Sequence, residues 1–154
     1  MSYGLVTHVA INVPDLVEAE AFYTEFFDTG IAFRQTPIDG EWHTLPSEVD
    51  WPTAEEAGYE PRMSFIQKDD LFLALQVPAS SEHHQEDQSY HVGLEMSSAE
   101  LEDILLRADE LNCKILHQHD TGALIEDTLG YEWDIAVDWD TYRSATPSGP
   151  WIDI

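Results

Sequence analysis

The hydrophobic positions of the chain first alternate and then recur at helical spacing. Val9, Ile11 and Val13 alternate with small or polar residues, as expected for a strand with one buried face. The pair Pro14-Asp15 ends this strand, and Asp15 is a suitable first residue for capping a helix. The apolar stripe of that helix consists of Leu16, Ala19, Phe22, Tyr23, Phe26 and Phe27. The pattern predicts a strand followed by a helix that ends near residue 28.

The next part of the chain predicts further strands, interrupted by an irregular segment. A short strand is predicted at 31–35, and a hairpin at 62–67 and 71–77 with its turn at 68–70. Residues 36–61 are rich in proline and aromatic residues and fit no regular period. Within that segment only two short elements are predicted, a strand around 42–45 and a helical turn around 53–57.

The opening order returns after a polar linker at 78–89. Val92, Leu94 and Met96 alternate as the first strand does, and Ser97 begins a second amphipathic helix. Three strands are predicted after it, at 114–118, 123–127 and 132–138.

This recurrence predicts the architecture. We expect an α+β fold in one domain, 1–154, built from two βαβββ modules at about 5–77 and 90–138 with a tail at 139–154. The two sheets are expected to curl into a half-barrel-like groove. The irregular segment 36–61 is an insertion in module one that accounts for its greater length.

The amino-acid composition limits the kinds of partner that the protein is expected to bind. With 31 acidic and 6 basic residues the formal net charge is −25, so nucleic acid and anionic membranes would be repelled. No apolar run reaches the ~18–20 residues of a membrane span, and no secretory signal is visible, so a cytoplasmic location is expected. The single Cys113 excludes an internal disulfide and suits a small apolar filler. Acids dispersed along the whole chain favour adaptation to high salt; the alternative is an acidic protein of an ordinary cytoplasm.

The strand faces turned away from the helices carry the candidate chemistry. On these faces lie His8, Gln76, His91 and Asp134, and the two histidines are 83 residues apart at equivalent places in the modules. A single histidine there is usually only a polar surface residue, but the repetition favours a site. Two imidazoles with two oxygen donors suit a divalent cation such as Zn²⁺, Ni²⁺, Co²⁺, Mn²⁺ or Fe²⁺, with positions left for water or a chelating substrate.

Other residues are predicted to line the pocket. Asn12 and Glu95 lie farther along the faces that carry the histidines, and Phe72 lies on the hairpin strand that carries Gln76. Trp42 lies in the insertion, whose aromatic residues either fold over the groove as a lid or cover a sheet edge or a dimer contact. The histidines at 83–84 and 117–119 are interpreted as solvated surface.

Three segments resemble the vicinal oxygen chelate superfamily, which includes glyoxalase I, fosfomycin-resistance and bleomycin-resistance proteins and extradiol dioxygenases. They are THVAINVPDLVEAEAFYTEFF at 7–27, YHVGLEMSSAELEDILLRADELN at 90–112 and EDTLGYEWDIAV at 126–137. The resemblance implies metal ligands at His8, Gln76, His91 and Asp134. Asp134 stands where the family has Glu, and Thr128-Leu129 stands where its turn has Pro-Asp.

The expected function follows from the resemblance and the candidate ligands together. It is a glyoxalase I-like, metal-dependent lyase or isomerase acting on a small oxygen-chelating substrate, with Asp134 as a candidate catalytic base and a homodimer as the assembly. The alternatives are a metal-free, ligand-sequestering protein of the bleomycin-resistance type, a ring-cleaving dioxygenase, and a module that kept the fold without the site.

Overall fold

The computed structural model describes residues 6–78, 91–137 and 152, and the chain divides into two compact units, Met1–Asp87 and Gln88–Ile154. Each contains one helix packed on a mixed sheet in βαβββ order, and the first has one extra strand and one extra helix, so the α+β prediction is confirmed. The predicted tail lies outside the described residues except for Ile152, and the predicted linker except for Pro78.

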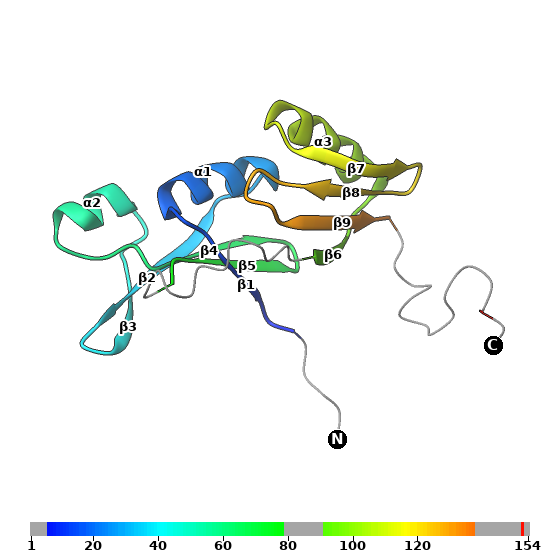
Figure 1. The fold of residues 1–154 in the computed structure, drawn as a ribbon. Helices are drawn as coiled ribbons and strands as arrows, with labels where there is room; N and C mark the ends of the chain where they lie inside the picture. Colours follow the sequence, from blue (N-terminus) through cyan, green and yellow to red (C-terminus); the bar gives the residue numbers. More distant parts are fainter. Residues whose placement is uncertain (1–5, 79–90, 138–151, 153–154) are drawn as a thin grey trace, which may run out of the picture. The chain divides into compact units, whose positions relative to one another are not determined.

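The first unit is a five-stranded sheet in the order β1-β5-β4-β2-β3 (Figure 1). Its elements are β1 (Val9–Asn12), α1 (Leu16–Phe26), β2 (Ile31–Ile38), β3 (Glu41–Thr44), α2 (Trp51–Glu56), β4 (Met63–Lys68) and β5 (Leu71–Gln76). Strand β1 runs parallel to β5, and the remaining pairs are antiparallel.

Helix α1 covers one face of this sheet. The side chain of Asp15 accepts a hydrogen bond from the backbone N–H of Glu18 and so satisfies one free donor of the first turn. Its apolar stripe packs on the sheet with Leu16, Tyr23 and Phe26 almost fully buried. The helix expected from the periodicity is therefore confirmed.

The insertion is regular where the sequence showed no period. Strand β2 continues through Pro37 to Ile38, and β3 pairs with it as a new edge strand. Pairing of β2 with β4 stops at Gln35. Pro37 lies beyond this point, so its missing N–H costs no hydrogen bond between β2 and β4. Helix α2 begins at the N-cap residue Asp50, whose pKa is lowered by hydrogen bonds from Thr53.

A buried polar network fastens α2 to the helix side of the sheet. Arg34 donates from Nε and Nη2 to the two oxygens of Glu20, at 2.7 and 2.9 Å, and from Nη1 to the carbonyl of Val49 at 3.1 Å. Ser64 donates to Glu20, and Trp51 Nε1 donates to Ser64 Oγ at 2.7 Å. Each buried polar group thus has a partner, which offsets the cost of removing it from water.

The second unit is a four-stranded sheet in the order β6-β9-β8-β7, with one helix on one face. Its elements are β6 (His91–Glu95), α3 (Ser98–Glu110), β7 (Lys114–His119), β8 (Gly122–Glu126) and β9 (Glu132–Ala136). Ser97 and Glu100 form a complete capping box at the start of α3. Trp133, Ile135 and Ile125 are fully buried, and the first two alternate with Asp134, which was predicted on the opposite face.

The turn before β9 is organised by the carboxylate of Asp127. Its oxygens accept hydrogen bonds from the backbone N–H groups of Leu129 and Tyr131, at 2.8 and 3.1 Å, and from Trp133 Nε1 at 2.8 Å. Gly130 takes a φ of 91°, which few other residues adopt. Although Thr-Leu replaces Pro-Asp in this turn, β9 keeps the predicted alternation, with Trp133 buried and Asp134 on the opposite face.

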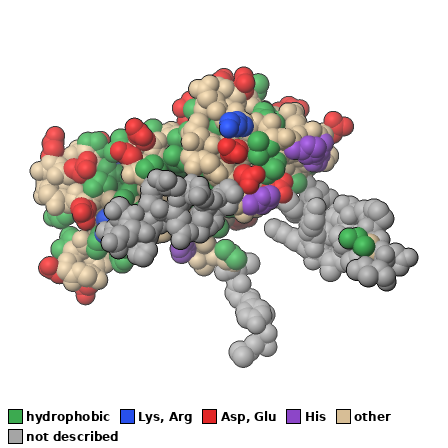
Figure 2. All heavy atoms as spheres, in the orientation of Figure 1, with side chains coloured by type: hydrophobic (Ala, Val, Ile, Leu, Met, Phe, Trp, Pro, Cys, Tyr) green, Lys and Arg blue, Asp and Glu red, His purple; other side chains and the backbone are tan. Residues whose placement is uncertain are grey.

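Acidic side chains are common on the surface of the described residues. On the face shown in Figure 2, Asp and Glu side chains are scattered over the helices and sheets. Among the described helices, none is both long and apolar enough to cross a membrane.

Candidate metal and ligand site

In the second unit, β6 and β9 bring the predicted ligands His91 and Asp134 together. Their parallel register sets His91 opposite Glu132 and Gly93 opposite Asp134. The imidazole Nε2 of His91 lies 3.2 Å from Asp134 Oδ2, and the two side chains are 53% and 35% exposed. An imidazole nitrogen and a carboxylate oxygen therefore lie side by side on the face without a helix, where a solute can reach them.

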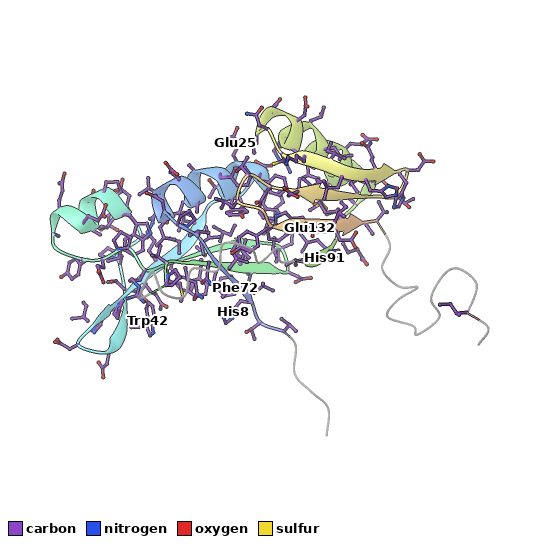
Figure 3. All side chains as sticks on the ribbon, in the orientation of Figure 1. His8, Glu25, Trp42, Phe72, His91 and Glu132 are labelled. Carbon is purple, nitrogen blue, oxygen red and sulfur yellow. The ribbon has the colours of Figure 1, made fainter. Side chains whose placement is uncertain are left out.

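Glu132 is a third polar group beside this pair, and the sequence pattern does not predict it as a site residue. It lies directly opposite His91, and the two are labelled beside each other in Figure 3. Strand alternation places Glu132 on the face of Asp134, but only the register between strands shows that it adjoins His91. Glu95, a predicted pocket residue, lies on the same face opposite Ala136 and is exposed.

In the first unit, His8 lies against an aromatic group. The register of β1 and β5 pairs Val9 with Leu73, so His8 is at the level of Phe72. The His8 ring meets Phe72 and Phe65 edge-on, with centroid distances of 6.1 and 5.8 Å. Figure 3 shows His8 and the predicted pocket residue Phe72 side by side.

Gln76 and Asn12 form a separate pair in the first unit. They are opposite one another in the register, and Gln76 Nε2 donates to Asn12 Oδ1 at 2.8 Å. Four residues separate Asn12 from His8 along the strand, about 13 Å at the usual rise. The structure therefore brings Gln76 to Asn12 rather than to His8.

The strand register in the two units explains why Gln76 does not lie beside His8 as Asp134 lies beside His91. In the second unit, Asp134 lies opposite Gly93, the residue two places after His91. In the first unit, the residue two places after His8 is Ala10, and the residue opposite it is Ala74, which has no ligating side chain. Alternation correctly places Gln76 on the face of His8, but it does not fix which residue of β5 is level with His8.

Three phenylalanines form an apolar floor beside His8, and two of them were not predicted. Phe33 stacks on Phe65 at 4.5 Å between ring centroids, and Phe65 lies 5.1 Å from Phe72. Phe65 is opposite both Phe33 and Ala74, so this floor spans β2, β4 and β5. Phe33 and Phe65 lie in the predicted strands at 31–35 and 62–67, so the alternation of residues in these strands could have placed both on this face.

The insertion contributes less to this face than the lid hypothesis predicts. Trp51 is fully buried and donates to Ser64 on the helix side of the sheet, so for this residue the lid interpretation is wrong. Trp42 is 49% exposed on the edge strand β3, opposite Pro37. Four strand spacings separate β3 from β1, about 19 Å, so Trp42 lies far from His8 (Figure 3).

Two further observations limit the chemistry. Among the described residues, no group of three or more His, Cys, Asp or Glu side chains is close enough to hold a metal ion.

Burial, with a smaller contribution from the charge of Asp127, raises the pKa of the Cys113 thiol to about 11. Cys113 is therefore protonated at neutral pH and is a poor nucleophile.

Comparisons with solved structures identify the fold. The fosfomycin resistance protein FosX from Listeria monocytogenes aligns with a TM-score of 0.59 over 94% of this chain and 98% of that chain, at 14% identity. Lactoylglutathione lyase from Agrobacterium tumefaciens gives 0.54 over 88% and 95%, at 17% identity. The trypanothione-dependent glyoxalase I of Leishmania major gives 0.54 over 93% of each chain, at 16% identity. The chain has the fold of the vicinal oxygen chelate superfamily.

The sequence resemblance to this superfamily is thereby confirmed at the level of the fold. No protein-family model matches the sequence, and no curated protein matches it either. Within the vicinal oxygen chelate fold, His91 and Asp134 occupy the first and last strands of the second module, as the resemblance implied.

Proposed function

We propose that the protein is a metal-dependent enzyme of glyoxalase I-like type, a lyase or isomerase that acts on a small substrate with two neighbouring oxygens. The observation that carries the proposal is the contact between His91 and Asp134 on an accessible strand face. Structural neighbours support the metal, since FosX from Listeria monocytogenes was solved in complex with Mn(II).

The donor set fits a divalent cation. Imidazole nitrogen and carboxylate oxygen together suit Zn²⁺, Ni²⁺, Co²⁺, Mn²⁺ and Fe²⁺. His91 and Asp134 would supply two ligands, and His8, which repeats the position of His91 in the first module, stays a predicted metal ligand. When bound, the metal supplies a Lewis acid that polarises the substrate oxygens and stabilises negative charge on them.

Glu132 is our candidate for proton transfer. The side chain of Asp134 is engaged with His91, whereas within the described residues no hydrogen bond or ion pair is found for the side chain of Glu132. It lies opposite His91, one of the two proposed ligands. A carboxylate beside the ligands can accept a proton from a substrate carbon next to one of the two oxygens. This division of roles replaces the earlier expectation that Asp134 itself is the base.

The charges favour a substrate without several negative groups. Arg34, Arg62, Lys68 and Lys114 each form an ion pair with a carboxylate. Arg34 is also buried on the helix side of its sheet, away from His8. A clamp for a polyanionic substrate would need cations that are free to pair with it, and these four are already paired with carboxylates.

The test is the visible absorption spectrum of the Co²⁺-loaded protein titrated with acetohydroxamate, a probe with two neighbouring oxygens. We expect stoichiometric Co²⁺ and a change of its spectrum on adding the probe, because open coordination positions remain. His91→Ala should lower the bound Co²⁺ by one equivalent and abolish the response to the probe, whereas His43→Ala, which removes an exposed histidine of β3, should leave both unchanged. A protein that binds Co²⁺ equally well without His91, or whose spectrum ignores the probe, would contradict the proposal.

A second candidate function rests on the floor formed by Phe33, Phe65 and Phe72. Stacked rings of this kind suit a flat aromatic ligand, which a metal-free protein of the bleomycin-resistance type would sequester. Under this alternative, the EDTA-treated protein binds a planar aromatic dye, and Phe72→Ala weakens that binding. Dye binding that depends on the metal would instead favour the enzyme.

A further inference from the structure

We infer that His117 and His119 form a second metal-binding site, a two-imidazole chelate for Cu²⁺, Ni²⁺ or Zn²⁺ on the edge strand β7. This site is independent of the proposed function and of its ligands. Figure 2 shows histidine side chains gathered at the end of the β7–β8 hairpin.

The spacing of the two rings carries the inference. Residues two apart on a strand point to the same face, and both histidines are exposed there. Their ring centroids are 5.7 Å apart, with an angle of 51° between the ring planes. With a metal–nitrogen bond of about 2.1 Å, two imidazoles on one ion have centroids roughly 4.5–5.5 Å apart. A small side-chain rotation therefore brings both nitrogens to one ion.

The surroundings of His119 hold its ring for this role. The ring lies over Gly122, where an added Cβ would be 2.9 Å from Cε1 and 3.0 Å from Nε2 of the imidazole. The backbone N–H of Thr121 donates to Nδ1 at 3.4 Å, and Thr121 Oγ1 lies 3.3 Å from the same nitrogen, so Thr121 fixes the orientation of the ring.

The site is distinct from the His91–Asp134 pair. His117 is opposite Leu124, and Leu124 is opposite Asp134, so two strand spacings, about 10 Å, separate the two sites. Two protein ligands leave most coordination positions to water, so binding is reversible. The net charge of −25 raises the local concentration of cations around such a site.

The test is isothermal titration of the full chain carrying His8→Ala and His91→Ala with NiCl₂ or CuCl₂, so that the site of the proposed function is removed. We expect one equivalent to bind, with Cu²⁺ tighter than Ni²⁺. His117→Ala and His119→Ala should each weaken binding at least about tenfold, the scale of losing part of a metal site, because the chelate needs both rings.

Two controls separate a chelate from scattered surface histidines. Exchange of neighbours, His117→Gln with Gln118→His, keeps the composition but puts the rings on opposite faces, and should weaken binding as much as His117→Ala. His43→Ala removes a lone exposed histidine and should change nothing. Unchanged affinity in the exchanged variant, with circular dichroism showing an intact fold, overturns the inference. Failure of the Co²⁺ test of the proposed function would leave this titration unaffected.

Discussion

At the scale of single residues, Glu20 links the inserted helix to the rest of the first unit. Its carboxylate is 12% exposed and accepts both a two-point contact from Arg34 and a hydrogen bond from Ser64, which in turn accepts from Trp51. Neither charge has ready access to water, so each depends on the other.

Replacing this carboxylate should therefore be costly. Glu20→Gln leaves the Arg34 guanidinium buried without a counter-charge, and the free energy of unfolding should fall by about 3–5 kcal/mol. Urea unfolding followed by tryptophan fluorescence measures the change. Glu25→Gln removes an exposed carboxylate from the same helix and should change stability by less than about 0.5 kcal/mol. Equal effects of the two variants would contradict this role.

Cys113 offers a second test at this scale. Because burial raises its pKa from 9.0 to about 11, alkylation by iodoacetamide should be slow at neutral pH and should accelerate as pH rises toward 11. The folded state holds this proton more tightly, so the thiol's contribution to stability is lost as pH rises from 9 to 11. A folded protein alkylated at pH 7.5 as quickly as in urea would show that the thiol is not buried as described.

Prediction from sequence succeeded for single residues where the alternation of side chains along one strand decides which face a residue lies on. It placed His91 and Asp134 on one face and Trp133 on the other, which the structure confirms. It did not identify Glu132 as the neighbour of His91, or separate Gln76 from His8, because both depend on how two strands align.

At the scale of secondary-structure elements, the existence of each element in the insertion was predicted better than its bounds. The strand predicted around 42–45 and the helical turn predicted around 53–57 are confirmed as β3, with 4 residues, and α2, with 6, although both begin earlier than predicted because elements this short show no clear period. The helices α1 and α3, with 11 and 13 residues and capped N-termini, were also predicted.

The turn at Asp127 is the element that sets the place of β9. Asp127→Ala leaves the buried N–H of Trp133 and two backbone N–H groups without an acceptor, so stability should fall by about 2 kcal/mol or more. Thermal unfolding measures this. Asp120→Ala, at an exposed position before β8, is the matched control and should leave the midpoint within a degree or two. An Asp127 variant as stable as its control would show that the turn does not depend on this carboxylate.

At the scale of the whole molecule, the charge governs the solvent that the protein needs. Dispersed carboxylates repel one another, and this repulsion is screened as the Debye length falls from about 10 Å at 0.1 M salt to about 3 Å at 1 M. The melting temperature should therefore rise steadily with KCl over this range. A melting temperature independent of KCl would argue against adaptation to high salt.

A titration with Mn²⁺ distinguishes a divalent metal held by His91 and Asp134 from one held elsewhere on the chain. Mn²⁺ prefers carboxylate ligands and binds weakly to imidazole pairs, so electron paramagnetic resonance of free Mn²⁺ during a titration reports this site rather than the one on β7. We predict one equivalent bound by the unaltered chain, at least about tenfold weaker binding for Asp134→Asn, and no change for Glu102→Gln, an exposed carboxylate of α3. An Asp134→Asn variant that titrates like the unaltered chain would contradict the account.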